Sequence, residues 1–267
     1  FAIMMLKQCG RQELMIPVVV LQTIAANLGS MLTPIGNPQN LYLYGLAGTG
    51  IGEFIMWLLP YTIVSALLLV ISILLIKNKN EIICIEDTDS EAAHNTSVPR
   101  VMAYSVLFIL ALLVVARVLT WYILAAAVLI TVLLLEKNVL TKADYALLLT
   151  FIGFFIFTGN MGRVEPVAHF LAGIVNGREL EVGIITSQGI SNVPAALLLS
   201  GFTDNIKNLS IGVNIGGLGT LIASMASLIS YKLYVNEVPE KKGKYFAVFT
   251  VYNIIFLVVL YVFTKLI

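Results

Sequence analysis

The chain has 267 residues, of which 59% are hydrophobic and only 12% are charged, and its mean hydropathy is +0.94. Soluble domains share core and surface residues more evenly, so this composition excludes a water-soluble globular domain and indicates an all-α polytopic membrane protein. The formal net charge of +1 gives no reason to expect a nucleic-acid partner.

Apolar stretches of membrane length divide the chain into successive segments. A helix that spans a bilayer needs about 20 apolar residues. Residues 14–47 are too many for one straight span, so we predict two half-helices around a polar loop, followed by a helix at 52–76. The polar stretch 77–99 is predicted as a cytoplasmic linker. The remaining segments are 100–119, 120–135, 145–161, a re-entrant hairpin at 182–202, a second broken helix at 206–231 and a last helix at 245–267.

Two of these segments carry the same polar pattern. Residues 27–37 and 214–224 both read Asn-x-Gly-small-x-x-Thr-x-Ile-small-polar. Such residues unwind an apolar helix and leave polar groups that hydrocarbon cannot solvate. When the same break recurs in two halves of a chain, it indicates a duplicated transporter with a substrate or ion site near the bilayer midplane. Residues 1–76 are then the C-terminal part of a first repeat, and residues 100–267 are the second.

The placement of Lys and Arg favours repeats of opposite orientation. If residues 182–202 enter the membrane and return, eleven Lys or Arg residues face the cytoplasm and five face outward. If they span it, the basic cluster at 232–244 is left outside. Gly189, Ser191, Asn192 and Pro194 also bend this segment and favour the hairpin. The helix with Asn27 then runs outward and the helix with Asn214 runs inward.

Three stretches carry a family resemblance: residues 33–40, residues 187–194 and the second Asn-x-Gly-Gly helix. They resemble the ion transporter superfamily of citrate transporter-like proteins, divalent anion/sodium symporters and arsenite permeases. The resemblance implies a homodimeric transporter that carries a di- or tricarboxylate with sodium by an elevator-type mechanism. The dicarboxylate branch has two hairpin tips that read Ser-Asn-Thr. Here Ser191-Asn192 matches one tip and Val193 replaces the Thr, while the partner hairpin is expected before Phe1.

The polar groups of the tip and the breaks suit two kinds of ligand. The start of a half-helix presents unpaired N–H groups and suits an anion, whereas unwound carbonyls with Thr and Asn oxygens suit a bare cation such as sodium. We therefore expect the anionic substrate at Ser191, Asn192, Val193, Pro194 and Asn37. We expect sodium at Asn27, Gly29, Thr33 and Gly36, with a second ion at Asn214, Gly216 and Thr220, and no other cofactor.

Other functions remain as alternatives or are not expected. The sequence has no His-Glu-x-x-His motif and no catalytic Asp pair, so we do not expect an intramembrane enzyme. An ion channel can also contain broken helices, and an arsenite, antimonite or proton-coupled anion permease fits the same superfamily. An ATP-driven pump would need a separate ATPase subunit, because the sequence lacks a phosphate-binding loop. We expect a multi-pass protein of the plasma (inner) membrane.

Overall fold

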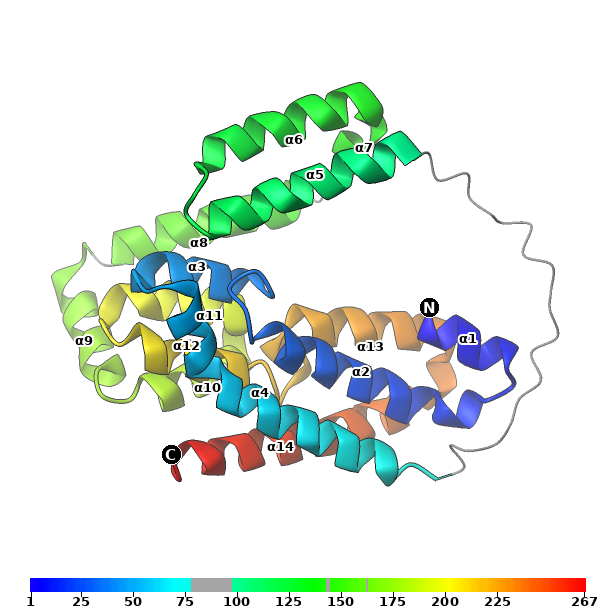
Figure 1. Cartoon of the computed structure of the whole chain (residues 1–267). Coiled ribbons are helices and arrows are strands. Elements are labelled where there is room, and N and C mark those ends of the chain that lie inside the picture. Colours follow the sequence, from blue (N-terminus) through cyan, green and yellow to red (C-terminus); the bar gives the residue numbers. More distant parts are fainter. Residues whose placement is uncertain (78–97, 143–144, 162) are drawn as a thin grey trace. The chain divides into compact units, whose positions relative to one another are not determined.

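The computed structural model describes residues 1–77, 98–142, 145–161 and 163–267 (Figure 1). The predicted linker at 77–99 lies almost wholly outside these residues. Every regular element of the described residues is helical, which confirms the all-α class. Within the described chain, the stretches long and apolar enough to cross a membrane are Gln12–Ser30, Ile51–Leu74, Val98–Val115 and Pro239–Thr264. The protein is an all-α polytopic membrane protein.

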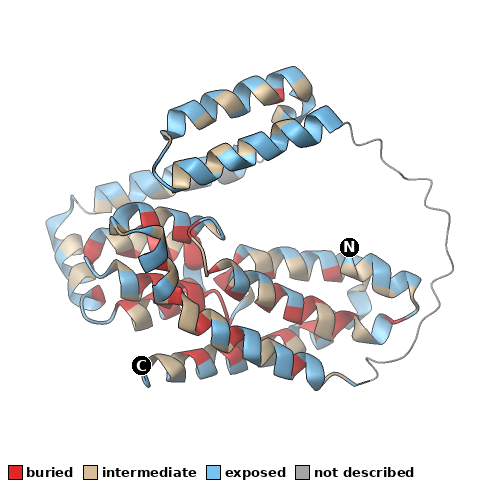
Figure 2. Cartoon of the chain, in the orientation of Figure 1, coloured by how far each residue is buried: buried red, intermediate tan, exposed pale blue. Residues whose placement is uncertain are grey.

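Contacts divide the chain into two compact units, one formed by Phe1–Ile83 with Ile152–Ile267 and the other by Cys84–Phe151. In the smaller unit, α5 (Val98–Val115) and α6 (Trp121–Leu135) lie side by side and are followed by α7 (Lys137–Thr141). Most side chains of α5 and α6 are exposed (Figure 2), as expected for helices that face lipid. The helix α8 (Tyr145–Met161) leads into the larger unit.

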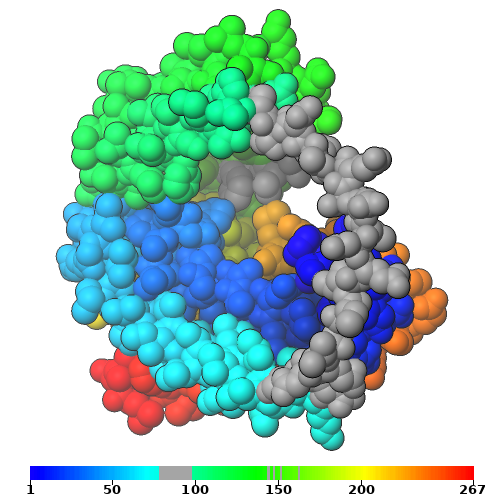
Figure 3. Space-filling view, turned by 45° about the vertical axis from the view of Figure 1, so that its right-hand side comes forward, coloured from blue at the N-terminus to red at the C-terminus, as the bar shows by residue number. Residues whose placement is uncertain are grey.

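The first predicted broken helix is interrupted in the structure. The helix α2 (Met15–Ser30) ends inside the first copy of the pattern, and α3 (Pro38–Ala47) begins after Asn37. Asn37 caps α3, since its side-chain oxygen accepts a hydrogen bond from the Asn40 amide at 2.9 Å. The helix α4 (Ile51–Leu74) follows. Figure 3 shows the α2, α3 and α4 segments, coloured blue to cyan, as one continuous face of the larger unit.

The second predicted broken helix is interrupted at the corresponding place. The helix α12 (Ile206–Ile215) is followed by the short turn η3 (Leu221–Ala223) and then by α13 (Met225–Glu237). Ser224 caps α13 by accepting a hydrogen bond from the Ser227 amide at 3.1 Å. Both α13 and the last helix α14 (Lys242–Thr264) extend beyond the predicted apolar ranges, because a helix can continue past its apolar part where water solvates its side chains.

The segment predicted as a hairpin forms two helices, α10 (Glu179–Ile190) and α11 (Asn192–Leu199), which are joined at Ser191 and pack against each other. Ser191 has a φ of 74°, which residues other than glycine rarely adopt. The helix α10 also packs against α12. A side-chain carbon at Gly212 of α12 would lie 2.6 Å from the Leu180 carbonyl oxygen, so this glycine permits the close approach. Whether the two helices enter a membrane and return stays a prediction.

The remaining short elements lie at the ends of these helices. They are α1 (Ala2–Gln8), η1 (Gln12–Leu14), α9 (Glu165–Val175), η2 (Ser200–Phe202) and η4 (Pro239–Lys241). An ion pair between Lys7 and Glu237 ties α1 to the end of α13.

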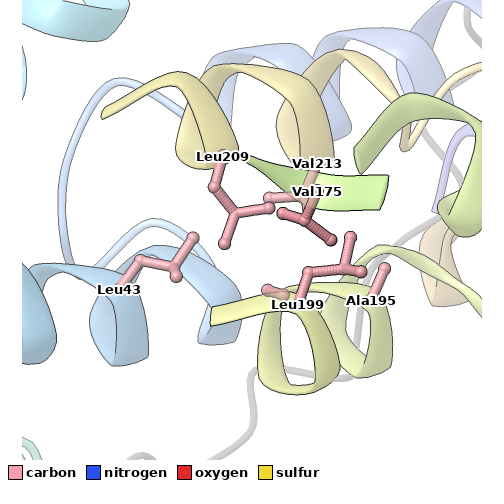
Figure 4. Packing of buried hydrophobic residues seen from close by; sticks show 7 residues of the cluster. Leu43, Val175, Ala195, Leu199, Leu209 and Val213 are labelled. Atoms are coloured by element: carbon pink, nitrogen blue, oxygen red, sulfur yellow. The ribbon is translucent and has the colours of Figure 1, made fainter. Parts of the chain in front are cut away.

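Buried apolar side chains gather where α11 meets α3 and α12 (Figure 4). This cluster consists of Leu43, Val175, Ala195, Ala196, Leu199, Leu209 and Val213. It therefore combines a half-helix from the first break, a half-helix from the second break and the second helix of the predicted hairpin. Val175 adds the end of α9, and close packing of this kind keeps these four helices in a fixed arrangement beside the two breaks.

Candidate functional site

The two breaks contact each other through equivalent residues of the two sequence copies. Asn27, the first residue of copy one, donates from Nδ2 to the hydroxyl of Ser224, the last residue of copy two, at 2.9 Å. Asn214, the first residue of copy two, accepts at Oδ1 from Nδ2 of Asn37, the last residue of copy one, at 3.0 Å. Reciprocal contacts of this kind are made by units related by a two-fold axis. Each Asn thereby reaches the N-cap of the other copy's second half-helix.

Asn214 uses all of its side-chain hydrogen-bonding capacity inside the protein. It is only 2% exposed. Its Nδ2 donates to Oδ1 of Asn40 at 2.6 Å and to the Ser210 carbonyl at 2.7 Å. Its Oδ1 accepts from Asn37 and, at 3.4 Å, from Nε2 of Gln39. A carboxamide has two donor hydrogens and two acceptor lone pairs, so this residue has no group left for a ligand.

The first break leaves several oxygens without a partner. Asn40 donates from Nδ2 to the carbonyls of Met31 at 2.7 Å and Thr33 at 3.3 Å, which holds the loop in place. Among the described residues, however, nothing donates to the carbonyls of Leu28 and Gly29 at the end of α2. The side-chain oxygens of Asn27 and Thr33 likewise accept no hydrogen bond there. The negative end of the α2 dipole coincides with these oxygens, which favours a cation.

The second break is closed by Gln188 of α10. Its Nε2 lies 3.1 Å from the Ile184 carbonyl oxygen and 2.9 Å from those of Gly216 and Leu218. Its Oε1 accepts from the Thr220 amide at 2.9 Å, and the Thr220 hydroxyl donates to the Gln188 carbonyl at 3.1 Å. The Gly216 carbonyl and the Thr220 amide are therefore hydrogen-bonded to the Gln188 side chain, and the Thr220 hydroxyl is bonded to its backbone carbonyl.

Asn192 stands at the start of α11 with an unpaired side chain. It is 6% exposed, and its carboxamide makes no hydrogen bond to any described residue. A side-chain carbon at Gly217 would lie 2.9 Å from Asn192 Nδ2, so the carboxamide faces the loop of the second break. No side chain caps α11, which leaves the amides of Asn192 and Val193 available, whereas Pro194 has no N–H. The Asn192 carboxamide and these two backbone amides are therefore hydrogen-bond donors that lack an acceptor among the described residues.

The other predicted residues lie nearby but are used differently. Ser191 donates to the Ala223 carbonyl at 3.4 Å, which links the tip to the second break. Val193 has a buried side chain, so it offers only its backbone amide. Gly36 packs so closely on the Ser30 carbonyl that a side-chain carbon would lie 1.8 Å from the oxygen. Asn37 is a cap and a partner of Asn214. The ligand roles of all these residues stay predictions.

Sequence reasoning missed four residues that shape the site: Gln39, Asn40, Gln188 and Ser224. All four lie in or beside the polar motifs. The signal that could have found them is a polar side chain inside an otherwise apolar stretch, since each such group needs a partner in a membrane.

Charged groups mark one end of the larger unit. Lys265, just beyond α14, forms an ion pair with Glu181 in the first turn of α10. The hydrogen bond from Lys265 holds the pKa of the Glu181 carboxyl below its usual range, so this carboxyl is ionised at neutral pH. The pair places the start of α10 beside the end of α14, at the charged boundary of the apolar segments.

Comparisons with known proteins agree with this architecture. The model of the citrate transporter family matches residues 1–207, which include the first break and the tip at Ser191 and end before Asn214. The chain belongs to the citrate transporter family. It is 36% identical to an uncharacterized transporter of Methanocaldococcus jannaschii over 93% of this chain and 66% of that protein. It is 28% identical to the inner membrane protein YbiR of Escherichia coli over 80% of this chain and 58% of that protein.

The chain thus spans less than two thirds of the length of either relative. No solved structure matches it.

The difference between Asn214 and Asn27 predicts unequal effects on stability. Replacing Asn214 with Ala removes the hydrogen-bond partner of buried groups of Gln39 and Asn40, and should lower the free energy of unfolding by about 2 to 4 kcal/mol. Asn27→Ala is the matched control at the equivalent position. Asn27 is only partly buried and donates to only two groups, so its loss should cost about 1 kcal/mol. Thermal denaturation of both variants in detergent measures the difference, and equal losses would contradict the central role of Asn214.

Proposed function

We propose that this protein is a secondary active transporter of a small anion, a di- or tricarboxylate, and that sodium drives it. Membership of the citrate transporter family supports transport of a carboxylate. The name of the Methanocaldococcus jannaschii relative, an uncharacterized transporter, supports transport in general. The broken helices and the tip supply the polar groups that such a site requires.

The observation that carries the proposal is the unpaired, buried carboxamide of Asn192. The residue is 6% exposed and its Nδ2 has no partner among the described residues, so a ligand that accepts from Nδ2 gains a hydrogen bond without displacing a protein group. The two available amides of the first turn of α11 and the positive end of its dipole favour a negative ligand. A carboxylate oxygen between Asn192 Nδ2 and these amides fits the arrangement.

Sodium is assigned to the first break. Four oxygens there accept no hydrogen bond from any described residue. They are the carbonyls of Leu28 and Gly29, Oδ1 of Asn27 and the hydroxyl of Thr33. Oxygen ligands at the negative end of a helix dipole are a chemically suitable site for a small cation. Asn27 also donates to the loop carbonyl of Gly217 at 3.4 Å, and Gly217 lies against the carboxamide of Asn192.

Alternating access completes the proposal. The reciprocal contacts of Asn27 with Ser224 and of Asn214 with Asn37 support inverted repeats around a shared site. We propose that a unit carrying α10 and α11 moves across the bilayer in an elevator-type cycle within a homodimer. The name of the Escherichia coli relative, an inner membrane protein, supports a plasma membrane location.

Asn192→Ala should reduce anion uptake into proteoliposomes by about 10- to 100-fold, because it removes a hydrogen bond to a charged ligand worth about 1.5 to 3 kcal/mol. The variant should remain inserted and monodisperse, since the native carboxamide has no partner to lose. Asn176→Ala, an exposed position between α9 and α10, is the matched control and should transport normally. Wild-type uptake by Asn192→Ala would remove this residue from the substrate site.

Thr33→Ala should raise the sodium concentration for half-maximal uptake by about tenfold, equivalent to about 1.4 kcal/mol of cation-binding free energy. The apparent affinity for the anion at saturating sodium should change little. Titration of uptake with sodium at constant ionic strength measures both values. An unchanged sodium dependence would refute the assignment of the cation to the first break.

A further inference from the structure

We propose that the Gln188 carboxamide takes the place of a cation at the second break, so that the transporter binds its coupling ion at the first break only. This inference refines the sodium coupling proposed above and rests on it for the transport consequence. Its structural part, that three carbonyls around Gln188 form a position suited to a cation, can be tested without transport.

Backbone carbonyl oxygens converge on Nε2 of Gln188. Three backbone carbonyl oxygens, from Ile184, Gly216 and Leu218, lie 2.9 to 3.1 Å from this nitrogen. The carbonyls of Gly216 and Leu218 come from the unwound segment after α12, and carbonyls of this kind are the ligands that transporters use for a bare cation, whereas the Ile184 carbonyl belongs to α10. An NH₂ group carries partial positive charge and two donor hydrogens, so it can occupy the position among these oxygens without an ion.

The orientation of the carboxamide is fixed by its partners. The Thr220 amide can only donate, which places Oε1 of Gln188 beside it at 2.9 Å. The nitrogen must then face the three carbonyls, and the reverse orientation would bring four acceptor oxygens together. The Thr220 hydroxyl, which donates to the Gln188 carbonyl at 3.1 Å, holds the same two segments together from a second side.

The loop of the second break is shaped to receive this side chain. Gly219 has a φ of 104°, and a side-chain carbon there would lie only 2.3 Å from Gln188 Oε1. Any other residue at this position would collide with the carboxamide as well as adopt an unfavourable backbone conformation. Gly219 and Gln188 therefore form a matched pair across α10 and the loop.

The two breaks differ in the way this inference requires. Gly29 in copy one corresponds to Gly216 in copy two, and Asn27 corresponds to Asn214. Gln188 donates to the Gly216 carbonyl, and Oδ1 of Asn214 already accepts two hydrogen bonds. In the first break, the Gly29 carbonyl and Asn27 Oδ1 accept none from the described residues. At these two pairs of positions, the second break has its oxygens hydrogen-bonded within the protein, and the first break retains oxygens for an ion.

Two consequences follow for the transport cycle. One sodium site, and not two, should activate uptake. In addition, the contact between α10 and the second break should persist without sodium, because a side chain and not an ion maintains it.

Gln188→Glu tests the inference directly, since it replaces the donor nitrogen with an oxygen and creates a carboxylate among three carbonyls. The purified variant should show a melting temperature that is low in choline chloride and rises with sodium, by about 5 °C at a concentration tenfold above the dissociation constant. The sodium-dependent rise should exceed that of the wild type. In transport, the Hill coefficient for sodium should be about one in the wild type and about two in the variant.

Gln188→Ala is the second variant, because it opens the same position without adding charge, and it should also gain a sodium-dependent rise. If Gln188→Glu does not fold, the sodium-dependent rise in the melting temperature of Gln188→Ala tests the inference instead. Gln8→Glu, an exposed position on α1, is the matched charge control and should behave as the wild type. Folded Gln188 variants without extra sodium dependence, or a wild type with a Hill coefficient near two, would overturn the inference. If the wild type transports no anion, the proposed function fails. The sodium dependence of the melting temperatures of the wild type and the Gln188 variants still tests whether Gln188 stands in the place of a cation.

Discussion

The structure depends on one constraint: a backbone that unwinds inside a membrane must find hydrogen-bond partners within the protein. Both breaks meet this constraint with side-chain carboxamides. Asn40 holds the loop carbonyls of the first break, and Gln188 holds those of the second. Asn27 and Asn214 then join the breaks to each other. The two breaks consequently lie in one compact unit, because each one supplies partners that the other lacks.

The proposed site consists of the polar groups that this network leaves without hydrogen-bond partners. A carboxamide at Asn192 and two backbone amides lack acceptors, and the oxygens at the end of α2 lack donors. The first set suits an anion and the second a cation, and the loop residue Gly217 lies against Asn192 and accepts from Asn27. Binding of the two ligands would therefore complete the hydrogen bonding of adjoining segments. That is a physical basis for coupling between them, since each ligand would help to fix the loop that the other contacts.

The breaks and the tip could be predicted from the sequence, because Asn, Gly and Pro stand out against apolar neighbours. Helices indeed end at Ser30 and Ile215, inside the two copies, and a joint occurs at Ser191. The role of Gln188 could not be predicted, since it depends on the distance between α10 and α12 that Gly212 permits. For the same reason, the sequence could not distinguish the fully bonded Asn214 from the partly free Asn27. The hydrogen bonds that a side chain makes in the folded protein, and not its residue type, decide whether it can bind a ligand or only stabilise the structure.

The most direct test of the account is uptake by proteoliposomes that contain the purified protein, with citrate, succinate, sulfate and arsenite compared under imposed sodium or proton gradients. The account predicts saturable uptake of citrate or succinate that a sodium gradient drives and a proton gradient does not. Flux of arsenite alone, carboxylate uptake driven only by protons, or a flux that does not saturate would contradict it.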